Sequence, residues 1–243
     1  MDIWSNKIIA RDIQEFVDIF NKYGACSLFN VNKLVNIAEL LPFVDYCDIE
    51  EIEIEFYNYK PISKTVPKIK HFKINLINSI KSIPNTDLNV KDPIEKCTFD
   101  IVITGFCDND KEYINCWHLD KDIRDEEDGE AKYTHPLYHF QYGGKYMGGL
   151  NDTGDTLLMG APRIPHPPMD IFLAIHFILN NYFNKNEDDY ICLQYLFADE
   201  GYQDILETAK RRMWYPYFEG LSNSSNTNED LNLANLFPLA VSP

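Results

Sequence analysis

The chain has 243 residues, of which 45% are hydrophobic and 14% aromatic, enough to bury one sizeable core in a single compact unit. Its 38 acidic and 22 basic side chains give a formal net charge of −16, which repels phosphate backbones and makes a nucleic acid an unfavourable direct ligand. The six cysteines form no Cys-x-x-Cys pair, and the N-terminal residues lack the apolar stretch of a signal peptide, so we expect a cytoplasmic protein. No apolar run is long enough to span a bilayer, so we expect the protein to lie outside the membrane.

Two helices are expected before any strand, because apolar residues recur there at helical spacing. The first pattern covers residues 13–20 and stops before Gly24, a residue that readily takes the left-handed conformation of a helix end. The second covers residues 34–41 and stops at Pro42. Both are interpreted as packing elements.

Strands are expected next. Between residues 51 and 56, Ile and Phe alternate with Glu, as in a strand with one buried face. The lysine-rich stretch 60–81 either balances the protein's own carboxylates or forms an anion-binding patch. Residues 99–104 and 113–119 alternate in the same way on either side of a turn and predict a hairpin. The acidic run 120–130 lacks the ligand order of an EF-hand and is expected to be a solvated loop.

The second half of the chain predicts further strands and then helices. Residues 134–144 are typical of a strand that ends in glycines, and residues 156–168 of a short strand that enters a proline-rich turn. Residues 169–183 are apolar on nearly every face and predict a central buried helix. A last amphipathic helix is expected over 203–215, with Pro216 ending or kinking it.

These patterns predict an α+β fold: a mainly antiparallel sheet of about five strands, with N-terminal helices and with C-terminal helices packed on one face. Residues 1–221 are expected to form a single domain. Residues 222–243 are expected to be a flexible linker and an apolar C-terminal tail, because 222–230 are small and polar. The tail either docks back on the domain or binds a partner.

Chemically useful side chains gather between Cys116 and Asp170, where four of the six histidines lie. Imidazole, carboxylate and guanidinium groups near glycine turns are the components of an acid/base or metal site. The candidate catalytic residues are His118, Asp120, His139, Arg163 and His166. Whether they hold a metal is left open.

Strand geometry limits how these side chains can combine. If His135 and His139 lie on one strand they are about 13 Å apart and cannot share an ion, unless the strand starts after His135. A cluster of His118 or Asp120 with His139 across neighbouring strands is favoured. His166 or Asp170 is expected to join this cluster from the proline turn. Alternatively, the histidines only hydrogen-bond across the sheet.

Two further structural alternatives remain. Arg163 and Asp170 either belong to the site or form a pair that fixes the start of a helix. The sequence contains no Walker motif, no Rossmann glycine fingerprint, no Gly-x-Ser-x-Gly elbow and no His-Glu-x-x-His helix, so we expect no cofactor.

The segments WHLD, HPLYHFQYGG, PRIPHPPMD and FILNNYF resemble an uncharacterised group of bacterial proteins associated with mobile-element and phage-defence neighbourhoods. The resemblance covers about residues 115–183 and implies a cellular context but no chemistry. The order of helix, antiparallel meander, His-Pro element and helices is also similar to ubiquitin-conjugating enzymes. Cys192 is the one cysteine after His135 and does not match the acceptor cysteine, so at most a non-catalytic relative is implied.

The sequence therefore favours a non-enzymatic protein-interaction component of an intracellular bacterial system such as phage defence, with a protein as its partner. The alternative is a small His/Asp-dependent hydrolase or nuclease, with or without a metal. An acidic mimic of DNA is a third hypothesis. The oligomeric state is left open.

Overall fold

The computed structural model describes residues 3–44, 48–58, 69–83, 91–107, 111–122, 135–149, 164–222 and 227–238. None of the helices in this described part combines the length and the apolar character that a membrane span requires.

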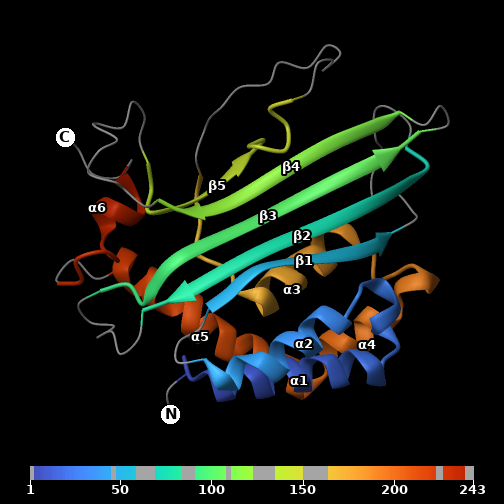
Figure 1. Ribbon diagram of the computed structural model, residues 1–243, viewed down its shortest axis with the longest axis horizontal. Helices are drawn as coiled ribbons and strands as arrows, with labels where there is room; N and C mark the ends of the chain where they lie inside the picture. Colours follow the sequence, from blue (N-terminus) through green and yellow to red (C-terminus); the bar gives the residue numbers. More distant parts are fainter. Residues whose placement is uncertain are drawn as a thin grey trace.

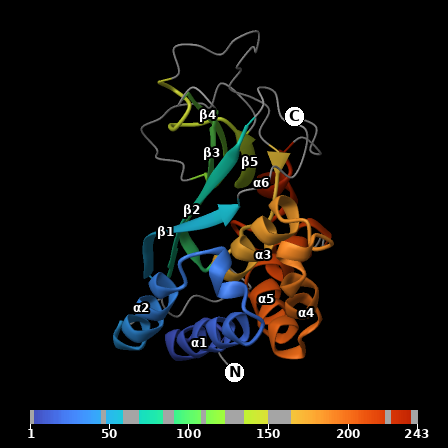
Figure 2. The same ribbon diagram turned by 90° about the vertical axis from the view of Figure 1, so that its right-hand side faces the viewer.

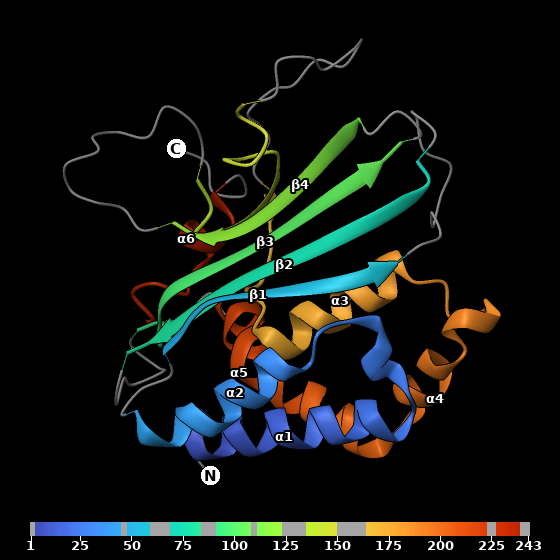
Figure 3. The ribbon, with the colours of Figure 1, turned by 45° about the vertical axis from the view of Figure 1, so that its right-hand side comes forward.

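A six-stranded antiparallel sheet forms the centre of the fold (Figures 1 and 3). Each strand pairs with its neighbours in the sequence, so the sheet is a simple meander. The α+β class is confirmed, with six strands where about five were expected. The strands are β1 (Asp48–Asn58), β2 (His71–Ser82), β3 (Ile94–Phe106), β4 (Glu112–Lys121), β5 (Tyr138–Tyr142) and β6 (Ile164–Pro165). The predicted hairpin is the β3–β4 pair.

Helices from both ends of the chain gather on one face of this sheet and beyond β1 (Figure 2). The left-handed Gly24, with φ 71°, ends the first helical segment as predicted. The N-terminal elements are α1 (Asn6–Lys22), η1 (Ala25–Leu28), α2 (Asn32–Leu40) and η2 (Leu41–Phe43). The C-terminal elements are α3 (Ile171–Tyr182), η3 (Asp188–Tyr190), α4 (Cys192–Ala198), α5 (Glu200–Ser222) and α6 (Leu233–Leu236).

The core lies between the sheet and the helices. Alternate strand residues such as Ile54, Leu76, Phe99 and Leu119 are fully buried there, as the period of two predicts. The helix α3 is central to this core because seven of its twelve residues are buried. It begins slightly later than the predicted range, because the carboxylate of Asp170 caps it by accepting the backbone N–H of Leu173 at 3.1 Å.

The last long helix continues past Pro216, whereas the sequence predicted an end or a kink there. A proline inside a helix removes one backbone hydrogen bond and costs about 3 kcal/mol. Burial of the following turn offsets this cost: Tyr217 and Gly220 are both buried, and the Tyr217 ring lies edge-on to Tyr138.

The C-terminal segment also differs from the expected flexible linker. Residues 227–238 pack on the domain, with Leu231 and Leu236 in the main core. The side chain of Asn228 accepts the backbone N–H groups of Asp230 and Leu231, which orders a stretch that the sequence assigned to the linker. The apolar tail therefore docks back onto the domain over these residues. Residues 223–226 of the expected linker lie outside the described part.

Candidate metal centre

The sheet face opposite the helices carries the candidate site. Leu119 and Phe140 point toward the helices and join the core, so their strand neighbours point the other way. This orientation brings His118, Asp120 and His139 onto one face, which we call the polar face.

Strand pairing brings these three side chains together. Asp120 on β4 is the direct register partner of His139 on β5, and His118 lies two residues before Asp120 on the same face. One ligand atom from each residue lies within 4.8 Å of the other two. The His118 Nε2 atom is 3.5 Å from the Asp120 Oδ2 atom. Two ligands of a tetrahedral ion with bonds of about 2.0–2.1 Å lie about 3.3 Å apart, so this pair is already close to ligand spacing.

The two imidazole rings of the cluster are arranged edge to face. The His139 ring is nearly buried, and its Nδ1 atom lies 3.3 Å from the carbonyl oxygen of Pro136. If Nδ1–H donates to that carbonyl, the lone pair is on Nε2, the arrangement usual for a metal-binding histidine. The rings of His118 and His139 have centroids 6.4 Å apart.

The His118 ring carries an unsatisfied atom. Among the described residues, its buried Nδ1 has no hydrogen-bond partner. A buried unsatisfied nitrogen costs about 1–3 kcal/mol, so this atom makes no favourable contribution to the stability of the fold. The alternative prediction, that His118 hydrogen-bonds across the sheet, finds no support from Nδ1.

The electrostatics of the site favour a cation. Burial raises the pKa of the Asp120 carboxyl; His118 and Lys145 act against this rise, and Asp100 adds to it. A raised carboxyl pKa means that the negative charge on Asp120 is incompletely compensated. A bound cation would supply the missing positive charge.

His135 lies beside the cluster because β5 starts at Tyr138, after this histidine. The 13 Å separation expected for His135 and His139 on one strand therefore does not apply. The rings of His135 and His139 have centroids 5.3 Å apart, and His135 Nδ1 lies 3.1 Å from an oxygen of Asp122. Sequence analysis had not singled out Asp122 as a neighbour of the site.

His166 lies on the other side of the sheet. Its ring centroid is 5.5 Å from that of Phe140, and its Nδ1 atom is 2.7 Å from the carbonyl oxygen of Pro167. Burial lowers the pKa of this imidazole. The predicted convergence of His166 with His118 and His139 is therefore wrong.

The expected pair of Arg163 and Asp170 is not described by the structure. Arg163 lies outside the described residues. Asp170 forms a buried ion pair with Arg212 of α5, with 2.7 Å between Arg212 Nη1 and Asp170 Oδ2. Asp170 therefore has an ion-pair partner, Arg212, that the sequence pattern did not identify.

A pocket of about 690 Å³ opens on the polar face. His118 and Asp120 form part of its wall, and the turn at Gly143 and Gly144 forms another part. Both glycines have positive φ, and a Cβ on Gly144 would lie 2.9 Å from His118 Nδ1. The turn therefore approaches the imidazole as closely as a glycine allows.

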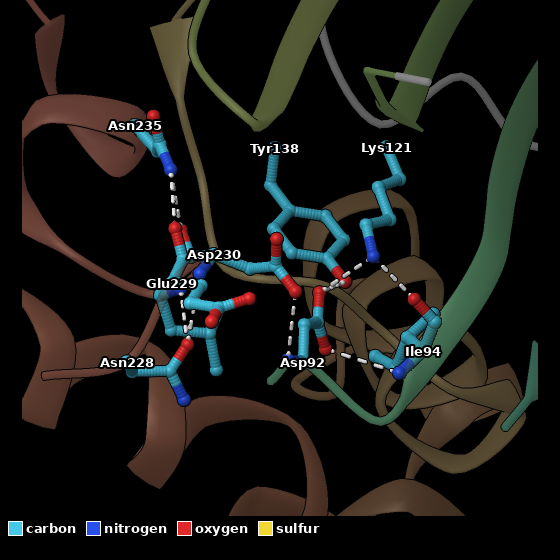
Figure 4. Close-up of polar contacts among 9 residues, drawn as sticks. Asp92, Ile94, Lys121, Tyr138, Asn228, Glu229, Asp230 and Asn235 are labelled. Atoms are coloured by element: carbon cyan, nitrogen blue, oxygen red, sulfur yellow. Dashed lines mark hydrogen bonds and ion pairs between the residues drawn. The ribbon is translucent and has the colours of Figure 1, made fainter. Parts of the chain in front are cut away.

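A buried polar network on the helix side fixes the strand pairing behind the site (Figure 4). Lys121 and Tyr138 are register partners, and each is the chain neighbour of a cluster residue. The Lys121 Nζ atom lies 2.9 Å from Asp92 Oδ2, and the Tyr138 hydroxyl donates to the same oxygen at 2.5 Å. Burial raises the pKa of Tyr138 well above its usual value, so the hydroxyl remains a donor.

The C-terminal segment completes this network (Figure 4). A carboxylate oxygen of Asp230 accepts the backbone N–H of Asp92 at 3.1 Å. The backbone carbonyl of Asn235 accepts the N–H of Leu137, one residue before β5, at 2.8 Å. The docked tail therefore holds the strand that carries His139.

No family model matches this chain, and neither a curated protein nor a solved structure is significantly similar to it. We therefore argue the function from the geometry of the site.

Proposed function

We propose that the protein is a hydrolase that depends on a divalent metal held by His118, Asp120 and His139. The observation that carries this proposal is that two imidazoles and one carboxylate have ligand atoms within 4.8 Å of one another beside a pocket. Catalytic zinc sites use three such protein ligands and keep a further position for water. Two nitrogen donors favour Zn²⁺ or a similar transition ion over Ca²⁺ or Mg²⁺.

The chemistry follows from the open coordination position. An ion of this kind lowers the pKa of a coordinated water to about 7, which supplies a nucleophile at neutral pH. The pocket beside His118 and Asp120 gives a substrate access to that water. The Nδ1 contact of His139 with the Pro136 carbonyl fixes the ring orientation that the ion needs.

A protein partner remains a second proposal, because one surface feature favours it. Leu40, Phe43 and Val44, at the end of α2 and in the turn after it, are 68%, 87% and 44% exposed. Neighbouring exposed apolar side chains are typical of interaction surfaces. This surface supports the interaction component that the sequence favours, and a hydrolase can also bind a partner there.

The metal is tested first by calorimetric titration of Zn²⁺ into the chelator-treated full chain. We expect one equivalent to bind, and His139→Gln or Asp120→Asn to weaken the affinity at least about 10-fold. His166→Gln is the matched control, because it removes a sequence-predicted candidate on the other side of the sheet. Its zinc affinity should equal that of the wild type.

Hydrolysis is tested on chromogenic esters with the zinc-loaded protein. Zinc should restore an activity that chelation removes, and Asp120→Asn should abolish it while the melting curve remains cooperative. Absence of stoichiometric zinc binding, or equal binding by wild type and His139→Gln, would contradict the proposal.

A further inference from the structure

The polar face carries three lysines whose positions bear on what the hydrolase acts on. We propose that the substrate is a small phosphate ester whose phosphate group is bound beside the metal centre by Lys81, Lys96 and Lys145. This inference rests on the proposed function and names its substrate class.

The register of the sheet places two of the lysines close to the cluster. Lys81 on β2 is the direct partner of Lys96 on β3, and both line the pocket. Two residues further along β3, about 7 Å away, Thr98 is the direct partner of Asp120. The lysine pair therefore lies one side-chain row from a proposed metal ligand.

Hydroxyl groups lie in the same side-chain row as the metal ligand, because Thr98 is the direct partner of Asp120. Ser79 is the direct partner of Thr98, and both line the pocket. Serine and threonine hydroxyls donate hydrogen bonds to phosphate oxygens, and ammonium groups neutralise their charge. The hydroxyl pair therefore shares its row with the metal ligands Asp120 and His139, and the lysine pair forms the adjacent row.

The third lysine also lines the pocket and comes from the segment after β5. Lys145 follows the Gly143–Gly144 turn, and its Nζ atom is 3.6 Å from an oxygen of Asp100. Lys81 is 3.1 Å from an oxygen of Glu95. Both ion pairs include an exposed partner, so each is weak and can be exchanged for an incoming phosphate.

The size of the pocket and the net charge select a small molecule over a polymer. A volume of about 690 Å³ is within the range that accommodates small ligands. The chain as a whole carries a formal charge of −16, which repels an extended polyanion such as a nucleic acid. A single phosphate ester can reach the three lysines without lying along that acidic surface.

The reaction is a phosphate ester hydrolysis. The water oxygen forms a bond to phosphorus while the bond from phosphorus to the ester oxygen breaks, with its electron pair left on the ester oxygen. The attacking water releases one proton to solvent, and the departing oxygen takes one from solvent. The products are an alcohol and inorganic phosphate, and nothing is oxidised or reduced.

The test begins with inorganic phosphate titrated into the chelator-treated full chain, so that zinc phosphate cannot form. Phosphate should bind, and Lys96→Met should weaken its Kd at least 10-fold. Lys33→Met, on the exposed side of α2, removes the same charge away from the pocket and should leave the Kd within 2-fold.

Turnover by the zinc-loaded protein then separates this inference from the proposed function. Lys96→Met should raise the KM for p-nitrophenyl phosphate at least 10-fold while zinc affinity remains that of the wild type. Normal zinc binding with no lysine-dependent phosphate binding would overturn the substrate class and leave the hydrolase intact. Lysine-dependent phosphate binding without zinc binding would overturn the hydrolase, and with it the assignment of a phosphate ester as substrate.

Discussion

At the scale of single residues, the glycine turn after β5 leaves no room for a side chain between Gly144 and the ring of His118. Gly143 and Gly144 have φ of 99° and 96°, so an alanine at either position is strained by about 1–2 kcal/mol. A Cβ on Gly144 would also lie 2.9 Å from His118 Nδ1, whereas a Cβ on Gly143 would meet no atom within 4 Å. An alanine at Gly143 therefore introduces backbone strain alone, whereas an alanine at Gly144 also displaces the imidazole of His118.

We predict that Gly143→Ala and Gly144→Ala lower the free energy of unfolding by similar amounts. Zinc affinity should fall at least about 5-fold in Gly144→Ala alone, because His118 must turn away from Asp120 to make room. Denaturant unfolding and zinc calorimetry on both variants check this. Equal zinc affinity in the two variants would show that His118 is not a ligand in the position described.

A second residue controls the acid stability. Burial, with a smaller contribution from Lys210, lowers the pKa of His176 to about 4. The Nδ1 atom of the ring lies 2.9 Å from the Tyr202 hydroxyl, and burial favours the neutral form of the ring. The unfolded chain has an ordinary histidine pKa of about 6.5 and so takes up the proton first.

The stability that depends on neutral His176 is therefore complete above pH 6.5 and is lost as the pH falls toward 4, by up to about 3 kcal/mol. His176→Gln keeps a polar side chain that can bond to Tyr202 and cannot titrate. Unfolding free energies from pH 7 to 4 should thus fall more steeply in the wild type than in this variant. Parallel curves for the two proteins would refute the assignment.

At the scale of elements, the docked C-terminal segment supports both the end of α5 and the start of β5. Gly220 of α5 packs so closely on the Leu231 carbonyl that a Cβ there would collide with backbone. Gly201, near the start of the same helix, faces the ends of side chains that can move. Alanine is otherwise favoured over glycine in a helix by up to about 1 kcal/mol.

We predict that Gly220→Ala destabilises the protein by about 2 kcal/mol or more, because the segment from Leu231 must shift. Gly201→Ala should be neutral or slightly stabilising. Thermal denaturation of the two variants, with limited proteolysis of the C-terminal segment, measures the difference. A Gly220→Ala protein as stable and as protected as the wild type would mean that this segment does not dock as described.

At the scale of the whole molecule, the spacing of apolar residues predicts where the helices and strands lie. Which side chains meet between neighbouring strands depends on the register of the strand pairing, and that spacing does not give this register. The spacing of His118 and Asp120 predicts a shared face from the sequence, because a strand repeats every two residues. The pairing of Asp120 with His139 depends on how β5 aligns with β4 after an intervening loop, which the sequence pattern does not specify.

The prediction that His166 joins His118 and His139 was wrong because the register between β5 and β6 was also unknown. His139 pairs with Pro165, so His166 is one residue out of phase and points to the opposite face. Arg212 was missed as the partner of Asp170 because they are 42 residues apart and meet only when α5 packs on α3. The linker prediction differs from the structure at residues 227–230, because their small polar composition does not predict the bonds that Asn228 accepts from Asp230 and Leu231.

The central claim is that one metal ion binds between β4 and β5, and anomalous X-ray scattering measures this most directly. Crystals of the zinc-loaded chain, recorded above and below the zinc absorption edge, should show one strong anomalous peak. We expect this peak about 2.0–2.2 Å from one atom each of His118, Asp120 and His139. A fully loaded crystal with no peak at these three side chains, or with its peak elsewhere, would contradict the account.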